Sequence, residues 1–241
     1  MTNHVEAITF DWFGTLATHR HKRGRGAVFT EYLASHRLQA APWHRSILYD
    51  VFNYYGAAYR LGFTDEEAHA FWTQFTHVLF ERAQVSGCPS GEVHCHASAI
   101  RDIFGSGGFE LYPDVLTVLN ALKQRGIRLA VVSNWPRGLE SFCHEMNMDH
   151  FFDVIIASAD IGIEKPDPRI FGEALRLLHA SPESVVHVGD TMDEDIAGAL
   201  SAGLQAVLLD RQDLQVNVEN KITSLSGLEV FLSQKGAQKA Q

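Results

Sequence analysis

Short apolar runs alternate with amphipathic helical segments, chiefly in the second half of the chain, and this alternation limits the possible folds more than any other feature. Each run is apolar on nearly every residue, as expected for strands that are covered on both faces. Strands that alternate with helices pair in parallel. The pattern therefore predicts an α/β fold with a parallel sheet. The strand-like runs are Val5–Phe10, Arg128–Ser133, Val154–Ala157, Val185–Val188 and Ala206–Leu209.

Three segments between these runs carry apolar residues at helical spacing. The first contains Val115, Leu119 and Leu122 and is followed by Gly126, which is a typical helix stop. The other two are Pro168–Ala180 and Asp193–Gly203. These segments are expected to be the helices that connect consecutive parallel strands.

A stretch of about 90 residues interrupts this alternation directly after the first strand. It is rich in aromatic residues and has a helical pattern, so most of its aromatic side chains are expected to pack between helices. We expect residues 16–109 to form a separate helical domain and residues 1–15 and 110–233 to form the sheet domain. The polar residues 234–241 are expected to be a disordered tail.

The composition excludes several classes of protein. The 241 residues carry a formal net charge of −9, which argues against binding of nucleic acid or anionic membranes by bulk electrostatics. No apolar stretch reaches the ~18 residues that a membrane span needs, and no signal peptide is visible. The three cysteines lack the spacing of a disulfide framework. We expect a soluble cytoplasmic protein with a small-molecule substrate.

Polar residues follow four of the expected structural segments, in the places where an α/β sheet carries its binding site. Asp11 closes the first strand, and Ser133-Asn134 closes the second. Lys165 precedes a helix that starts with proline, and the acidic run Asp190–Asp195 follows a later strand. The carboxyl ends of parallel strands meet at one edge, so we expect these side chains to lie together.

Taken singly, each of these residues also has an ordinary structural explanation. Thr15 suits a turn, Ser133 and Asn134 suit helix caps, and Asp193–Asp195 suit the start of a helix, where acidic groups interact favourably with the dipole. Their occurrence in this order, each beyond its own strand, favours a shared site.

At these segments the chain resembles the haloacid dehalogenase-like (HAD) hydrolase superfamily, helical-cap subfamily I. The resemblance covers nearly the whole chain and is most similar to the domain-containing type-3 group. It implies a Rossmann-like core, an α-helical cap domain inserted after the first strand, and catalysis through an aspartyl-enzyme intermediate. The motifs that carry it are the Asp11–Leu16 segment, Ser133–Arg137, Ser158–Gly162, Lys165–Phe171 and His187–Asp190.

The resemblance also assigns roles by position. Asp11 would be the nucleophile, and Asp195 would brace the site. The cofactor would be Mg²⁺, bound by Asp11, the main-chain carbonyl of Phe13 and Asp190. The charge on the group attacked would be held by Thr15, Ser133, Asn134 and Lys165. A carboxylate that attacks an anionic group needs such a cation and such donors to overcome repulsion.

The sequence departs from the family pattern at Phe13. Phosphatases of the family carry a second aspartate two residues after the nucleophile, where it protonates the leaving oxygen. Phenylalanine transfers no proton, and loss of a general acid costs ~10²–10⁴ in rate. The first interpretation is a Mg²⁺-dependent hydrolase of a small phosphorylated metabolite whose leaving group needs little protonation, or whose acid comes from the cap. The candidates for such an acid in the cap are His36, His44, His69, His77, His94 and His96.

The second interpretation is a 2-haloacid dehalogenase, because a halide leaves without a proton. The aromatic residue at position 13 suits these enzymes, and Arg45 would then bind the substrate carboxylate. Against it stands Asp190, because the family's dehalogenases have a small neutral residue there. A bound cation would occupy the nucleophile that displacement of a halide needs free.

Two further interpretations stay open. A phosphonoacetaldehyde hydrolase also lacks the second aspartate, but it needs a lysine in the cap, and Lys22 is the one lysine between Leu16 and Tyr112. The other interpretation is a catalytically weak binding or regulatory module. Retention of Asp11, Lys165 and Asp190 together speaks against that, because a scaffold needs none of them.

Overall fold

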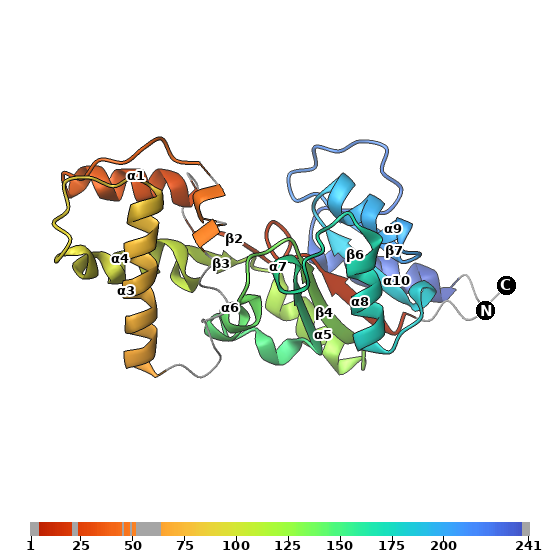
Figure 1. Cartoon of the computed structure of the whole chain (residues 1–241). Coiled ribbons are helices and arrows are strands. Elements are labelled where there is room, and N and C mark those ends of the chain that lie inside the picture. Colours follow the sequence, from red (N-terminus) through yellow and green to blue (C-terminus); the bar gives the residue numbers. More distant parts are fainter. Residues whose placement is uncertain (1–4, 21–23, 45, 49, 52–63, 238–241) are drawn as a thin grey trace. The chain divides into compact units, whose positions relative to one another are not determined.

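A computed structural model describes residues 5–20, 24–44, 46–48, 50–51 and 64–237 (Figure 1). The Lys22 and Arg45 of the sequence interpretations lie outside these residues. The chain divides into two compact units, which are described separately. The first unit comprises Met1–Thr18, Leu111–Trp135 and Met148–Gln241, and the second comprises His19–Glu110 and Pro136–Asn147.

The first unit contains a six-stranded sheet in the order β5-β4-β1-β6-β7-β8, and every neighbouring pair is parallel. The predicted parallel α/β fold is therefore confirmed. All five predicted strands are present, and the sequence pattern missed only the short β8 among the strands of this sheet. The strands are β1 (Ala7–Phe10), β4 (Arg128–Ser133), β5 (Val154–Ala157), β6 (Val185–Gly189), β7 (Gln205–Leu209) and β8 (Lys221–Ile222).

The register of the central strands brings their carboxyl ends to one edge. Phe10 at the end of β1 pairs with Val131 on β4 and with Val188 on β6. The chain leaves β1 between two neighbours that both follow it in sequence, which is the switch point where open α/β sheets bind ligands. Asp11 therefore emerges between the end of β4 and the end of β6.

Helices cover this sheet as predicted. Helix α8 begins where the Asp167 side chain accepts a hydrogen bond from the Arg169 amide, with a proline in its first turn. Its apolar face, including Ile170 and Phe171, packs with Ala7 and Val132 in one buried cluster. The helices of this unit are α5 (Val115–Gln124), α7 (Ser158–Ile161), α8 (Pro168–Leu178), α9 (Gly198–Ser201) and α10 (Leu228–Ala237), and a π-helical turn η6 (Met192–Ala197) precedes α9. Helix α10 extends four residues into the segment 234–241, for which disorder was expected; residues 238–241 lie outside the described part.

The second unit is helical. Its longest helix starts with a complete capping box, in which Thr64 and Glu67 each bond the other's main-chain amide. Among the described residues of this unit, the helices include α1 (Arg25–Ser35), α3 (Asp65–Arg82), α4 (Ala97–Phe104) and α6 (Leu139–Glu145), with 3₁₀ turns at Val93–His96 and Ser106–Gly108. The strand β2 (Ala17–His19) pairs with β3 (Phe109–Leu111) in a separate two-stranded sheet.

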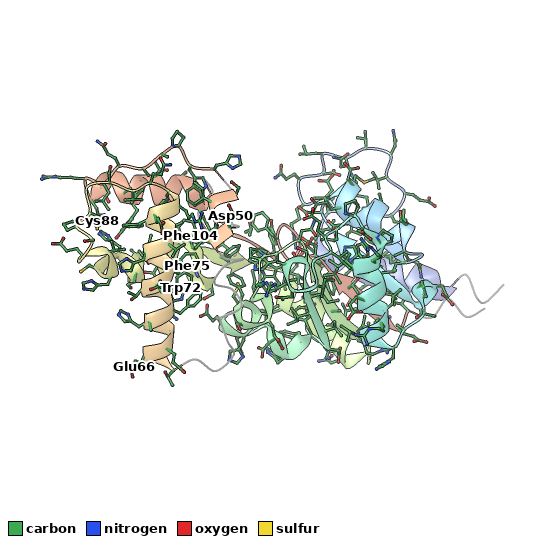
Figure 2. The ribbon with its side chains drawn as sticks, viewed as in Figure 1. Asp50, Glu66, Trp72, Phe75, Cys88 and Phe104 are labelled. Atoms are coloured by element: carbon green, nitrogen blue, oxygen red, sulfur yellow. The ribbon has the colours of Figure 1, made fainter. Side chains whose placement is uncertain are left out.

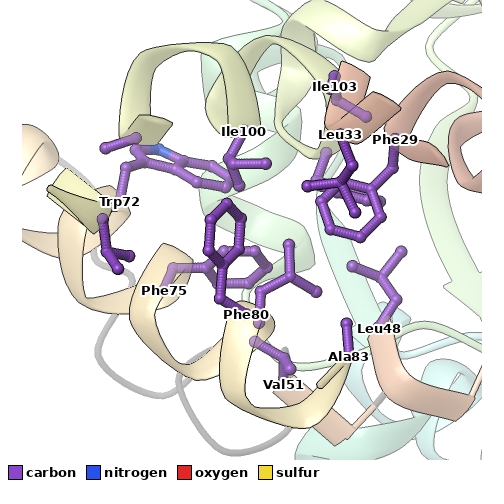
Figure 3. Packing of buried hydrophobic residues seen from close by; sticks show 14 of the residues in the cluster. Phe29, Leu33, Leu48, Val51, Trp72, Phe75, Phe80, Ala83, Ile100 and Ile103 are labelled. Atoms are coloured by element: carbon purple, nitrogen blue, oxygen red, sulfur yellow. The ribbon is translucent and has the colours of Figure 1, made fainter. Parts of the chain in front are cut away.

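Aromatic side chains form the core of the second unit, as the sequence pattern predicted. Phe29, Trp72, Phe75 and Phe80 are buried together between α1, α3 and α4 (Figure 3). Figure 2 shows Trp72 and Phe75 along the length of α3 with Phe104 beside them. Segment 136–147 also belongs to this unit, where Phe142 packs edge-on against Phe109 with ring centres 5.0 Å apart. The sequence pattern had placed this segment in the sheet domain.

An ion pair in the first unit holds the main chain that follows Asp11. Both terminal nitrogens of the Arg211 guanidinium contact the Asp114 carboxylate at 3.0 Å, and Nη2 also donates to the Thr15 carbonyl at 2.8 Å. The guanidinium lies 3.7 Å from the centre of the Tyr112 ring. Burial raises the pKa of Asp114, but the hydrogen bonds from Arg211 and the Leu225 amide outweigh burial and leave the pKa below its ordinary value. Arg211 thus connects three segments that are distant in sequence: the turn at Thr15, the segment with Tyr112 and Asp114, and its own loop.

We expect Asp114→Ala to destabilise the protein by about 3 kcal/mol at pH 7, because it leaves the Arg211 charge largely buried without its partner. The side chains of the pair are only 16% and 15% exposed. Because the folded pKa of Asp114 is lowered, its contribution is complete above the unfolded value near 4 and is lost as the pH falls through the folded value. Urea unfolding at pH 7 and at pH 3 tests both statements.

The control for this prediction is Glu173→Ala, which removes the pair between Glu173 and Arg176 on the surface of α8. Those side chains are 31% and 65% exposed, so the expected loss is below ~0.5 kcal/mol. An equal loss from both variants, or an Asp114→Ala effect that is the same at both pH values, would contradict the assignment.

Candidate active site

A tight turn presents Asp11 at the end of β1. The Asp11 amide continues the strand ladder by donating to the Val188 carbonyl at 2.9 Å. The chain then reverses, with the amides of Leu16 and Ala17 both donating to the Trp12 carbonyl. Gly14 has a φ of 85°, a left-handed conformation that suits glycine. The turn holds the Asp11 carboxyl group at the sheet edge, where the structure leaves it 7% exposed.

Two donors converge on one oxygen of Asp11. The Ser133 hydroxyl, at the end of β4, donates to Oδ1 at 2.9 Å, and the Lys165 ammonium donates to the same atom at 2.6 Å. In the described part of the chain, no hydrogen bond involves Oδ2. Asp11 therefore has one oxygen held by the protein and one available for attack or for binding a cation.

The Lys165 ammonium is buried between two carboxylates. It lies 2.6 Å from Asp11 and 2.5 Å from Asp195, and its side chain is 1% exposed. Burial lowers the pKa of Lys165, but the charges of Asp11 and Asp195 outweigh burial and raise the pKa above its ordinary value. For Asp11, burial raises the pKa, and this effect outweighs the opposing effect of the Lys165 charge. The lysine stays charged and places a positive group beside the carboxylate that would attack.

Asp195 is saturated by donors from the protein. Its Oδ1 receives Lys165 Nζ and lies 3.2 Å from His187 Nε2. Its Oδ2 receives the amide of Thr191 at 2.9 Å and the hydroxyl of Thr191 at 2.7 Å. Burial raises the pKa of Asp195, but the hydrogen bond from His187 and the charge of Lys165 lower it well below its ordinary range. This geometry supports the bracing role proposed for Asp195.

The side-chain amide of Asn134 is hydrogen-bonded to the main chain of Lys165 and is not free to bind a substrate. Its Oδ1 accepts from the Lys165 amide at 2.7 Å, and its Nδ2 donates to the Lys165 carbonyl at 2.9 Å and to Glu194 at 3.1 Å. The peptide bond that follows, Lys165–Pro166, is cis. We therefore propose that Asn134 acts by holding the main chain of Lys165, a role different from the direct stabilisation of substrate charge predicted from the sequence.

Three carboxylates form the one group of potential metal ligands among the described residues. Oxygen atoms of Asp11, Asp190 and Asp195 all lie within 4.8 Å of one another. A Cβ on Gly14 would come within 2.1 Å of Asp190 Oδ2, so the glycine makes room for this carboxylate. Burial, Asp11 and Asp195 together raise the pKa of Asp190 to about 7. Three acidic groups against one lysine form the kind of oxygen-rich, negatively charged site that suits Mg²⁺.

Of the remaining predicted site residues, Thr15 and Phe13 lie in the turn after Asp11, and Arg45 lies outside the residues that the structure describes. Thr15 is fully buried, and its hydroxyl has no hydrogen-bond partner within the described ranges. Phe13 forms a bridge with Ala17 and is 38% exposed. Arg45 lies outside the described residues, so its predicted role in substrate binding stays a prediction.

Two residues beneath the site carried no role in the sequence interpretation. Thr9 and His187 are fully buried in the central strands and contact each other at 2.8 Å. Each is a polar residue within an otherwise apolar run, and this exception to the pattern was the available signal.

The comparison with protein families agrees with this arrangement. The model of the haloacid dehalogenase-like hydrolases matches residues 5–203. The chain belongs to this family. It is therefore a hydrolase of the haloacid dehalogenase-like type, as the motifs predicted, and the family match spans the helical insertion and the strands β1, β4, β5 and β6 of the sheet.

Curated relatives place phosphatases among the similar proteins. The chain is 37% identical over 125 residues to a glyceraldehyde 3-phosphate phosphatase of Methanothermobacter thermautotrophicus, covering 49% of this chain and 52% of the relative. It is 30% identical over 142 residues to the haloacid dehalogenase-like hydrolase domain-containing protein 3 of Bos taurus, covering 59% and 56%. The matches thus span about half the length of these relatives. The second match confirms the predicted resemblance to the type-3 group.

A solved structure shows the same fold over nearly the whole chain. The 2-haloacid dehalogenase from Pseudomonas syringae pv. tomato DC3000 superposes with a TM-score of 0.62 at 24% identity, covering 95% of this chain and 99% of the other. At this identity the likeness concerns the fold alone. None of the helices in the described ranges is both long and apolar enough to cross a membrane.

Proposed function

We propose that this hydrolase is a Mg²⁺-dependent phosphatase that acts on a small phosphorylated metabolite through an aspartyl-enzyme intermediate. The observation that carries the proposal is the pairing of Asp11 with Asp190 around one oxygen-rich point, beside the buried Lys165. The phosphatase name of the archaeal relative supports the same class of reaction.

In this proposal, one oxygen of the Asp11 carboxylate attacks the phosphorus atom, and the other would hold Mg²⁺ next to the Ser133 hydroxyl and the Lys165 ammonium. A phosphorus–oxygen bond forms to Asp11, and the bond to the leaving oxygen breaks with its electron pair going to that oxygen. Water then attacks the aspartyl phosphate, which releases inorganic phosphate and restores the carboxylate. The buried ammonium and hydroxyl lower the repulsion between the attacking carboxylate and the anionic substrate.

The residues present fit the metal that the family implies. Asp11, Asp190 and the main-chain carbonyl of Phe13 would hold Mg²⁺, while the four donors to Asp195 keep that carboxylate in its bracing contacts. When bound, the ion supplies positive charge that offsets the negative charge of the phosphate oxygens.

The proposed substrate class follows from Phe13. Because position 13 supplies no proton, the leaving oxygen departs as an anion unless a donor outside this turn protonates it. We therefore expect phosphates with stable leaving groups, such as acyl and aryl phosphates, to react faster than alkyl phosphates.

We expect hydrolysis of p-nitrophenyl phosphate to require Mg²⁺ and to fall more than about tenfold in excess chelator, because the carboxylates then repel the substrate. Asp190→Ala should remove the activity and the metal dependence together. The measurement is phosphate and halide release from a panel of aryl, alkyl and acyl phosphates and 2-chloroacids, with and without Mg²⁺.

The matched control is Asp193→Ala, which removes an exposed carboxylate three residues further along the same acidic run and should leave the rate unchanged. Undiminished chloride release from a 2-chloroacid in excess chelator would contradict the proposal and establish the dehalogenase alternative. Binding of Mg²⁺ without turnover of any substrate would favour a binding or regulatory module.

A further inference from the structure

Thr9 and His187 form a buried polar pair inside the sheet, directly below the candidate active site. They face each other in the register between β1 and β6, two residues before Asp11 and three before Asp190. Both are fully buried, and Thr9 Oγ1 lies 2.8 Å from His187 Nδ1. Because unpaired polar groups are costly in such a position, this contact needs a defined donor and a defined acceptor.

The second nitrogen of His187 connects this pair to the reacting groups. Nε2 lies 3.2 Å from Asp195 Oδ1, and the same oxygen accepts from the Lys165 ammonium at 2.5 Å. Lys165 in turn contacts Asp11 at 2.6 Å. A continuous line of contacts therefore runs from the Thr9 hydroxyl to the carboxylate that attacks.

Asp195 and Thr9 together determine which ring nitrogen carries the proton. A neutral imidazole donates from one nitrogen and accepts at the other. The His187 ring is fully buried, and burial disfavours its charged form and lowers its pKa, so we take the ring as neutral. The ionised Asp195 can only accept, so Nε2 must carry the hydrogen and Nδ1 must accept from the Thr9 hydroxyl. Thr9 thus selects the tautomer in which His187 can hold Asp195.

We propose that His187 is a positioning residue whose Nε2–H tautomer is fixed by Thr9, and that this N–H orients Asp195 so that Lys165 stays directed at Asp11. The Phe171 ring supports the orientation, meeting the imidazole edge-on at 78° with centres 4.9 Å apart. The inference rests on the proposed function in one respect, which is that Asp11 is the group that attacks.

Loss of the Thr9 hydroxyl leaves the Nδ1 lone pair buried without a donor, which weakens the preference for the Nε2–H tautomer. In the other tautomer, the Nε2 lone pair faces Asp195 Oδ1, and the repulsion displaces the carboxylate together with Lys165. A displacement of about 1 Å costs on the order of 10²-fold in rate. Thr9→Val should therefore lower kcat towards p-nitrophenyl phosphate by roughly 10- to 100-fold, with little change in KM.

A double-mutant cycle separates this role from simple packing. His187→Gln offers an amide N–H to Asp195 that has no tautomer to select, so it should retain far more activity than His187→Leu. In the His187→Gln background, Thr9→Val should cause a smaller loss of kcat than in the wild type, because the amide presents its N–H to Asp195 by simple rotation. An equal loss from Thr9→Val in both backgrounds would show that the hydroxyl acts only through packing and would overturn the proposal.

The matched control is Ser184→Ala, which removes another buried hydroxyl immediately before β6, at the end of that strand away from the site. Its hydroxyl donates only locally, to the Ser181 carbonyl. This variant should keep the wild-type kcat. Thermal unfolding of all variants establishes which of them are folded.

A second measurement does not depend on any activity. The ¹⁵N shifts of histidine-labelled protein distinguish the two neutral tautomers, and His187→Gln identifies the signals of residue 187. We expect Nε2 to be protonated in the wild type and a mixture of tautomers in Thr9→Val. A wild-type ring protonated at Nδ1, or a Thr9→Val spectrum unchanged from wild type, would overturn the proposal. The expected shifts in a protein without phosphatase activity would overturn the proposed function and support the assignment of His187.

Discussion

Asp11→Asn is expected to abolish phosphate hydrolysis, with a loss of at least about 10³-fold in kcat, or ~4 kcal/mol of barrier. An amide is a far weaker nucleophile than a carboxylate, and it is also a poor ligand for Mg²⁺. Single-turnover kinetics with p-nitrophenyl phosphate at saturating Mg²⁺ measure the effect directly.

The surroundings of Asp11 predict that this variant stays folded. The asparagine oxygen can still accept from Ser133 and from Lys165, which contact Oδ1 in the wild type. Lys165 also keeps the charge of Asp195 at 2.5 Å, so the ammonium is not left without a counterion. Residual activity within about tenfold of wild type, ~1.4 kcal/mol, in a folded variant would show that another group attacks the substrate.

Most of the fold could be predicted because parallel strands buried on both faces leave a simple pattern in the sequence. The apolar runs of β1, β4, β5, β6 and β7 are visible without knowledge of their partners. The polar residues near their ends could be grouped because parallel strands share one edge, and Ser133 and Lys165 do both contact Asp11. The short β8, with two residues, carries no comparable signal.

The contacts that the sequence did not reveal are pairings between side chains distant in the chain. Thr9 meets His187 across 178 positions, and Arg211 meets the Thr15 carbonyl across 196 positions. The hydrophobic periodicity of a segment does not indicate such partners, because they are brought together only by the strand register and by the positions of the loops. Asn134 illustrates the same limit: its place after β4 was evident, but its two hydrogen bonds to the Lys165 main chain depend on tertiary structure.

The predicted role of each site residue in catalysis is a separate question from its position. The structure brings Asp190 beside Asp11, which is the arrangement that a metal-dependent hydrolase needs. A dehalogenase needs no cation in its active site. The mutual repulsion of the three carboxylates around one lysine would therefore destabilise the site without helping that reaction. This balance is the physical reason for preferring phosphoryl transfer to Asp11 over displacement of a halide.

Phe13→Asp is expected to raise the turnover of alkyl phosphates by ~10², which is the low end of a general-acid contribution. Phosphatases of the family carry an aspartate at this position, two residues after the nucleophile, where it protonates the leaving oxygen. Aryl phosphates should change little, because their leaving groups are stable as anions. The measurement is kcat/KM for aryl phosphates and for alkyl phosphates, in the wild type and in the variant.

The position tolerates this change better than a buried one would. The Phe13 side chain is 38% exposed, so a carboxylate there keeps contact with water and avoids most of the cost of burying a charge. Phe13→Asn is the matched control, since it has the same shape as aspartate and no acidic proton. If Asp and Asn raise alkyl-phosphate turnover equally, the gain comes from removing the aromatic ring. If Phe13→Asp accelerates both substrate types by the same factor, leaving-group protonation does not limit the reaction, and the proton comes from a donor outside the turn.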